Sequence, residues 1–241
     1  MSISTKVVED KITSFYRGLD TQDYSIFYRL PEFAESLRSQ VRPFDNEVKN
    51  TVYGLLAEET AHYLLRMYKD AGYPLEIIDS LVFEYEKGKT TEVDLIVVTP
   101  NMVYVIECKH RSRDITILSD GTLQIDGKNQ SPIDQNIGHI KRLFNKAGYG
   151  NLVTKDRILN IVYLMLNNCR VQNPITLFNK ELNGAFAGRT NLLPLIHKFE
   201  TEKAGGRIPY VKFADSLRKL DLGEEGMKYH IGYLKDKYNE S

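Results

Sequence analysis

The sequence lacks several features that would indicate a specialised class of protein. It contains no tryptophan and only two cysteines, Cys108 and Cys169, which lie far apart and belong to no paired metal motif. This argues against a disulfide-rich scaffold and a structural zinc site, and it favours a reducing compartment. The five histidines form no His-x-x-x-His or His-Cys pattern, so the sequence does not indicate a histidine-based metal site or catalytic triad.

Net charge and long apolar runs are lacking as well. Lys and Arg total 32 against 32 Asp and Glu, so no overall positive field predicts nucleic-acid binding, and any phosphate-binding surface has to be a local patch. No stretch approaches the roughly 20 apolar residues of a membrane span. Glu9, Asp10 and Lys11 stand where a secretory signal would need an apolar run. We therefore expect a cytoplasmic protein with no membrane segment.

The hydrophobic residues that are present, 42% of the 241, follow helix and strand patterns. Helical periodicity predicts helices at 51–70, 132–147, 192–203 and 215–221, and another beyond Gly226. Strand patterns cover 75–86, 90–98 and 103–110, two short runs within 114–130, and a continuous apolar run at 158–168. This order predicts an α/β fold, a mixed β-sheet flanked by helices.

We expect three regions along the chain. Residues 1–48 read as an amino-terminal helical extension, because two short helical patterns there are followed by the break "RPFDNE". Residues 49–200 form the main domain. Residues 201–241 form a carboxy-terminal helical cap on the same core.

The stretch "TTEVDLIVVTPNMVYVIECKH" at 90–110 is the most informative part of the sequence. If its turn is symmetric about the bond between Pro100 and Asn101, Asp94 lies opposite Glu107, and Lys109 lies on the same face two residues further. Pro100 cannot take the positive φ of the tightest hairpin turns, which favours a four-residue loop.

The paired carboxylates have two interpretations. Two opposed carboxylates in an apolar sheet repel each other unless a cation joins them, and hard oxygen ligands in a pair suit Mg²⁺. Alternatively, Lys109 bridges Glu107 and Asp94 or Glu92 in a structural ion-pair network. Spacing alone leaves both interpretations open.

The arrangement of Asp94, an apolar hairpin and Glu107-Cys108-Lys109 is similar to the D…(D/E)-x-K signature of the PD-(D/E)xK nuclease superfamily. More specifically, "EVDLIVVTPNMVYVIECKH" resembles the core of the NERD (nuclease-related) domain, "GLLAEETAHYLL" resembles its first helix, and "SPIDQNIGHIKRL" resembles its N-P-x-x-Q helix. The resemblance runs from about residue 54 to about residue 195. It departs from the pattern at Ala57, Ser131 and His110, none of which is a charged ligand. It implies a restriction-endonuclease-like fold.

Roles for the site residues follow from the resemblance and from helical periodicity. Periodicity points Glu58 inward, and the resemblance implies that it completes a metal site with Asp94, Glu107 and the carbonyl of Cys108; a Glu58 that binds only Lys109 or lies at the helix edge is the alternative. The resemblance also implies catalytic roles for Lys109, which we expect to act by its charge, and for Gln135 near the scissile phosphate.

We therefore predict a Mg²⁺-dependent deoxyribonuclease, with Mn²⁺ able to substitute. A nuclease-fold module that binds nucleic acid or a partner protein without cutting is the alternative. The expected partners are DNA, a protein docked on the amino-terminal helices, and a second copy of the chain, since two cuts on a duplex favour a homodimer. The residues expected to contact DNA are His110, Arg111, Arg113, His139 and Arg142, for which a solvated surface is the alternative.

Overall fold

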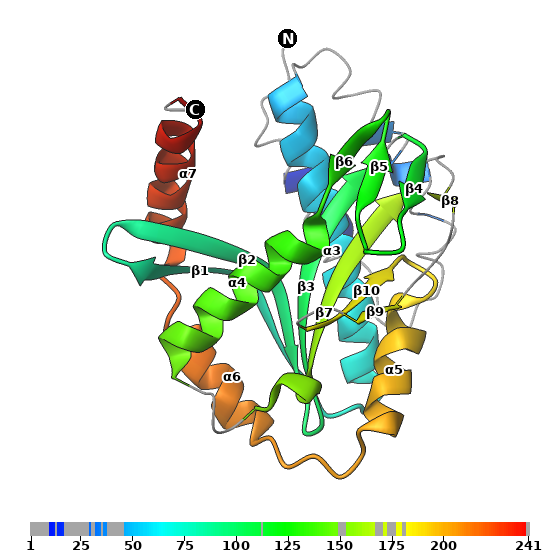
Figure 1. The fold of residues 1–241 in the computed structure, drawn as a ribbon, viewed down its shortest axis with the longest axis vertical. Helices are drawn as coiled ribbons and strands as arrows, with labels where there is room; N and C mark the ends of the chain where they lie inside the picture. The colour runs from blue at the N-terminus through cyan, green and yellow to red at the C-terminus, as the bar shows by residue number, and fades with distance from the viewer. Residues whose placement is uncertain are drawn as a thin grey trace.

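Figure 1 shows the computed structural model of the chain. The structure describes residues 46–239 except 112, 149–152, 167–170, 173–176 and 180–181, together with residues 10–12, 14–16, 29, 32–34 and 36–37. Within these residues, no helix is long and apolar enough to cross a membrane. Cys169 lies outside the described residues.

A six-stranded mixed sheet forms the centre of the molecule. In spatial order its strands are β1 (Glu76–Glu86), β2 (Lys89–Val98), β3 (Val103–Arg111), β7 (Ile158–Leu166), β10 (Asn183–Ala187) and β9 (Leu177–Asn179). β1, β2 and β3 are antiparallel, whereas β7 runs parallel to both β3 and β10. β7 is buried along nearly its whole length, which is the pattern of a parallel strand covered on both faces. The predicted mixed α/β fold is confirmed.

The hairpin of β2 and β3 has the predicted register. Leu95 pairs with Ile106 and Val98 pairs with Val103, so the turn is symmetric about the Pro100–Asn101 bond. Residues 99–102 form the expected four-residue loop, which the amide of Thr99 closes by donating to the carbonyl of residue 102 at 2.9 Å.

Helices cover both faces of the sheet. α3 (Asn46–Asp70) and α5 (Leu192–Glu202) pack on one face against Leu95 and Val97 of β2, and we call this layer the α3-side core. α4 (Pro132–Ala147) and α6 (Tyr210–Arg218) pack on the other face and form the α4-side core. α7 (Gly223–Asn239) lies beside the β1–β2 hairpin, which projects away from the rest of the sheet (Figure 1). A short 3₁₀ turn, η1 (Lys155–Arg157), precedes β7.

The run at 114–130 differs from the prediction of two strands at the sheet edge. It forms three strands, β4 (Ile115–Ile117), β5 (Leu123–Ile125) and β6 (Lys128–Gln130), which join β8 (Val171–Gln172) in a separate four-stranded sheet. Gly121 and Gly127 have φ of 82° and 74°. Such left-handed turns reverse the chain after only a few residues, which allows two turns in so short a run.

The helix boundaries match the predictions in part. α4 begins at Pro132 and ends at Ala147, as predicted, and the next residue, Gly148, adopts the left-handed conformation with φ of 69° that commonly ends a helix. Ser131, whose position before Pro132 and whose residue type favour an N-terminal cap, makes no side-chain capping hydrogen bond, so that expectation is wrong. α6 begins at Tyr210, directly after Pro209 and five residues before the predicted start.

The described residues of the amino-terminal region are helical where two helices are predicted. Ile12, Tyr16, Ala34 and Leu37 are buried in the α3-side core, and the Tyr16 hydroxyl lies 2.5 Å from the Thr60 hydroxyl. These residues therefore share a core with the main sheet. The region boundaries at 48 and 200 stay a prediction; α3 begins at Asn46, and α5 runs across residue 200.

Candidate active site at the fork of the sheet

The central sheet divides into two branches beside Asp94. The β2–β3 ladder ends at the pair Leu95–Ile106; beyond it, β2 continues with β1 and β3 continues with β7. The amide of Cys108 donates to Asp94 Oδ2 at 2.7 Å, so a side-chain carboxylate takes the place of a strand carbonyl. We call residues 92–94 of β2 and 107–109 of β3 the fork.

A kink in the β1–β2 hairpin accounts for the fork. Ser80 has a φ of 43°, a left-handed value, and its neighbours Asp79 and Leu81 pair with Leu95 and Val93 on either side of Asp94. Residues three apart in a regular strand point to opposite faces, yet Ile78 and Leu81 both lie in the α4-side core, as do Val93 and Ile96. The two faces of the β1–β2 hairpin therefore exchange sides at Ser80 and Asp94, and beyond this point β2 no longer pairs with β3.

Three polar side chains meet on the β3 side of the fork. Glu107 is buried, and its Oε1 accepts a hydrogen bond from Lys109 Nζ in a salt bridge. The same oxygen accepts a second hydrogen bond from Gln135 Nε2 of α4 at 3.0 Å. Within the described residues Lys109 makes its salt bridge with Glu107, not with Asp94 or Glu92.

The position of Gln135 is fixed by a polar network behind it. Asn136 and Asn160 are fully buried, and Asn136 donates to Asn160 Oδ1 at 2.8 Å and to the carbonyl of Val105 at 3.0 Å. Asn160 donates in turn to the carbonyl of Ile133 at 2.8 Å. These bonds hold the first turn of α4 on β3 and β7, which brings the adjacent Gln135 to Glu107.

A cavity of about 560 Å³ lies between the fork, α4 and α7; we call it the fork cavity. Its lining residues include Tyr85, Thr90, Thr91, Glu92, Asp94, Glu107, Lys109, Asp134, Gln135, His139, Arg142 and His230. This volume is in the range of ligand pockets in proteins. Asp94, Glu107, Lys109 and Gln135, which the sequence selects, therefore share one cavity.

Burial and mutual repulsion raise the pKa of three carboxyl groups around the fork, those of Glu92, Glu58 and Asp94. Desolvation and the charges of Asp94 and Glu107 raise the pKa of Glu92 to about 7. Desolvation and the charges of Glu92 and Glu107 raise the pKa of Glu58 to about 7. The pKa of Asp94 is raised well above its ordinary value by the same causes, with Glu107 as the main repelling charge.

Lys109 remains a cation in this setting. Its burial lowers the pKa, but the charge of Glu107, the hydrogen bond to it and the charge of Asp94 outweigh burial and raise the pKa above the ordinary value. A lysine of this kind holds its proton at neutral pH and offers positive charge, not a base.

Glu58 comes from α3, on the other side of the fork. It does not line the fork cavity, but its charge interacts with Glu92, Glu107 and Lys109. Cys108 is buried in the α3-side core, and burial raises the pKa of its thiol well above the ordinary value. The thiol is therefore unreactive, whereas the backbone of Cys108 faces Asp94.

The donor set suits a cation that needs few protein ligands. Among the described residues, no three His, Cys, Asp or Glu side chains are grouped tightly enough to hold a metal ion by themselves. Asp94 and Glu107 each use one oxygen in the hydrogen bonds above, which leaves Oδ1 and Oε2. Mg²⁺ is bound through one or two carboxylates, waters and substrate phosphates, so Asp94 and Glu107 fit it.

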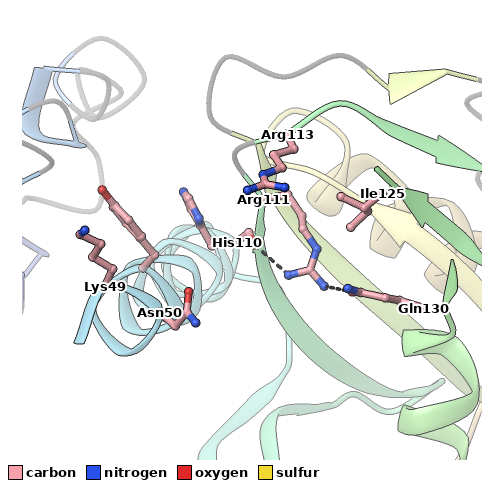
Figure 2. A pocket seen from close by; sticks show the side chains of 8 residues that line it. Lys49, Asn50, His110, Arg111, Arg113, Ile125 and Gln130 are labelled. Atoms are coloured by element: carbon pink, nitrogen blue, oxygen red, sulfur yellow. Dashed lines mark hydrogen bonds between the residues drawn. The ribbon is translucent and has the colours of Figure 1, made fainter. Parts of the chain in front are cut away.

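The residues expected to contact DNA divide between two places. His139 and Arg142 line the fork cavity, where His139 Nδ1 lies 2.8 Å from the Thr91 hydroxyl and the Arg142 guanidinium lies 4.7 Å from the ring centre of Tyr85. His110, Arg111 and Arg113 instead line a separate cavity at the end of β3 (Figure 2).

Sequence reasoning missed His230 and Thr90, which also line the fork cavity. His230 Nδ1 lies 2.9 Å from the Thr90 hydroxyl, and this contact brings α7 to the wall of the cavity. A single histidine in a polar helix carries no sequence signal for such a contact. Thr90 and Thr91 are both buried. In the sequence, the one hint of a role for Thr90 is the pair of threonines at the start of the apolar strand.

The residues from α3 to β7 match a known family. Residues 53–165 match the family model of the nuclease-related domain, NERD. This match confirms the predicted resemblance to the NERD domain over these residues. No curated protein and no solved structure matches the chain.

The matched residues contain the fork and most of the side chains around it. Glu58, Asp94, Glu107, Lys109 and Gln135 all lie within the matched residues. His230 lies outside them, so α7 adds a residue to the fork cavity from beyond the matched residues.

Proposed function

We propose that this protein is a metal-dependent nuclease that hydrolyses phosphodiester bonds in DNA. The observation that carries the proposal is the convergence of Asp94, Glu107 and Lys109 on one cavity where β2 leaves β3. The NERD match supports the same class of activity. DNA processing, repair and defence against foreign DNA are the roles that fit it.

Asp94 and Glu107 would hold Mg²⁺, or Mn²⁺ in its place, with the carbonyl of Cys108 as a further oxygen ligand and Glu58 adding negative charge from α3. When bound, such a cation polarises a phosphoryl oxygen and lowers the pKa of a water ligand. The raised pKa values of Asp94, Glu92 and Glu58 support this assignment, because a cation relieves the repulsion that raises them.

The remaining residues prepare the site for an anionic phosphate. Lys109 supplies a fixed positive charge that stabilises the negative charge growing on the phosphate oxygens. Gln135 fixes the orientation of Glu107, and the amide of Cys108 fixes that of Asp94, so both carboxylates are set before a substrate arrives. His139 and Arg142 stand on the α4 wall, where they would contact the DNA backbone.

A cytoplasmic location, a homodimer and a partner protein on the amino-terminal helices stay predictions. A homodimer would follow from cleavage of both strands of a duplex. Gel filtration with light scattering, with and without duplex DNA, measures the oligomeric state directly.

Cleavage assays test the proposal. Linear, circular and single-stranded DNA are each incubated with the protein and Mg²⁺, Mn²⁺ or EDTA, and products are followed on gels. We expect cleavage with Mg²⁺ or Mn²⁺ and none with EDTA, and a loss of about 10²- to 10³-fold in Asp94→Asn and Lys109→Ala. Asp215→Asn, at an exposed position of α6, is the matched control and should cleave as the wild type does.

Two results would reject the proposal. Cleavage that persists in EDTA would exclude the metal. Equal inactivity of the wild type and both variants on every substrate, with DNA binding retained, would favour the module that binds nucleic acid without cutting it.

A further inference from the structure

A second cavity, of about 450 Å³, lies at the carboxyl end of β3 (Figure 2). Its walls come from the first turns of α3, from the last residues of β3 and from β5 and β6. We call it the end cavity. Asp94, Glu107 and Lys109 do not line it, so it is distinct from the fork cavity.

The lining of the end cavity is cationic. Lys49, Arg111 and Arg113 contribute positive charge, and no carboxylate is among the lining residues. Arg111 donates to Gln130 Oε1 at 2.8 Å and to the carbonyl of His110 at 2.9 Å, two neutral acceptors that hold its guanidinium in place (Figure 2). Arg113 forms a salt bridge with Asp126. A cavity of this charge is suited to an anion such as a phosphate.

One wall of the end cavity is aromatic. The rings of Tyr53 and His110 are stacked, with centroids 4.5 Å apart and planes 14° apart, and both side chains are half-buried. Ile125 adds an apolar contact from β5. Cations beside a flat aromatic surface are the combination by which proteins hold unpaired nucleotides, since the cations meet the backbone and the rings stack on the base.

The end cavity is joined to the fork through β3 and the entry to α4. Arg111 follows Lys109 by two residues, which in a strand is about 6.6 Å along the same face. The charge of Arg111 acts to lower the pKa of Lys109, and the charge of Glu107 acts to raise the pKa of Arg111, so the two sites interact electrostatically. Gln130, the partner of Arg111, ends β6 just before the α4 helix that carries Gln135.

We infer that the end cavity binds an unpaired nucleotide of the DNA strand that is cut, next to the scissile phosphate, with Arg111 on the backbone phosphate and the base against Tyr53 and His110. This inference rests on the proposed nuclease function, which supplies the strand. It specifies the substrate class as DNA that is single-stranded or frayed at the site of cleavage. A paired base is stacked within its duplex and cannot reach the ring of Tyr53 without leaving it.

Binding measurements separate this inference from the nuclease proposal. Fluorescence anisotropy is recorded in EDTA, where no cleavage is expected, with a labelled single-stranded oligonucleotide and with the blunt duplex of the same sequence. The variants are Tyr53→Leu and Arg111→Gln. Tyr53→Phe, which keeps the ring, and Lys212→Gln, an exposed cation on α6 far from the cavity, are the matched controls.

We expect the single strand to bind more tightly than the duplex. Tyr53→Leu should weaken single-strand binding about 5- to 150-fold, as the loss of one base stack does, and Tyr53→Phe should bind as the wild type. Arg111→Gln should reduce the slope of log K against log salt by about 0.7, the change for one phosphate contact on a single strand, whereas Lys212→Gln should leave the slope unchanged.

The inference is overturned if Tyr53→Leu, folded by circular dichroism, binds the single strand as tightly as Tyr53→Phe and Arg111→Gln keeps the wild-type slope. Equal affinity for the blunt duplex and the single strand would overturn it as well. Cleavage by the wild type is scored separately. Absence of cleavage together with the expected binding results would reject the nuclease proposal and leave the end cavity as a strand-binding site.

Discussion

Glu92 is the carboxyl group whose replacement tests the electrostatics of the fork most clearly. Its pKa is raised from 4.5 to about 7 by burial and by the charges of Asp94 and Glu107. A carboxyl group with a raised pKa holds its proton more tightly in the folded protein than in the unfolded chain. The free energy of unfolding therefore falls as pH rises from about 4.5 through about 7.

The size of this effect follows from the shift. The rise in the pKa of Glu92 from 4.5 to about 7 corresponds to a free-energy penalty of about 3 kcal/mol for its ionised form, at about 1.4 kcal/mol per pH unit. Solvent screening of a partly exposed group reduces it to about 1–2 kcal/mol. Glu92→Gln removes the charge, so the variant should be more stable than the wild type by this amount at pH 8 and equally stable at pH 4.5.

Urea denaturation in EDTA at several pH values between 4.5 and 8 measures the difference. Saturating Mg²⁺ at pH 8 should shrink it, because a cation on Asp94 and Glu107 offsets the repulsion that Glu92 experiences. Glu225→Gln, with a side chain that is 87% exposed, is the control and should show no pH-dependent difference. A Glu92→Gln difference that is the same at pH 4.5 and pH 8 would refute the reasoning.

Three further substitutions test separate parts of the structure. Gln135→Ala removes a hydrogen bond to Glu107 from an exposed side chain, so DNA cleavage should fall about 10- to 100-fold while urea stability stays unchanged. Asn160→Leu removes the buried hydrogen bonds that Asn160 makes with Asn136 and with the carbonyl of Ile133, and should lower the free energy of unfolding by about 1–3 kcal/mol in urea titrations. Cys108→Ala should cleave DNA within about twofold of the wild type, and thiol-blocking reagents should not inhibit the wild type, because the buried thiol has a raised pKa. Full activity of Gln135→Ala, unchanged stability of Asn160→Leu or inhibition by thiol reagents would contradict the respective assignment.

The part of the site that could be predicted from sequence is the part contained in one hairpin. Two apolar runs on either side of a short loop, and the restriction that Pro100 places on the turn, favour a register symmetric about the Pro100–Asn101 bond, which β2 and β3 adopt. That register brings Asp94 level with Glu107. The helical stripe of α4 similarly predicts a helix from Pro132 to Ala147, which carries Gln135.

The remainder depends on contacts between distant segments. Serine has no sequence preference that would reveal the left-handed Ser80, yet this residue turns the β1–β2 hairpin over and opens the fork. His230 reaches the fork cavity from α7, 140 residues after Thr90. The end cavity needs Tyr53 from α3 and Gln130 from the second sheet, and no pattern in the sequence indicates that 114–130 joins β8 in a separate sheet.

The presence of a cation between Asp94 and Glu107 is the central claim, and anomalous diffraction tests it most directly. A crystal soaked in Mn²⁺ is measured at the manganese absorption edge, beside an Asp94→Asn crystal treated in the same way. The account predicts an anomalous peak between Asp94 and Glu107 in the wild type and its loss in the variant. A wild-type crystal that shows no peak there, from a protein that cleaves DNA in the same Mn²⁺ solution, would contradict it.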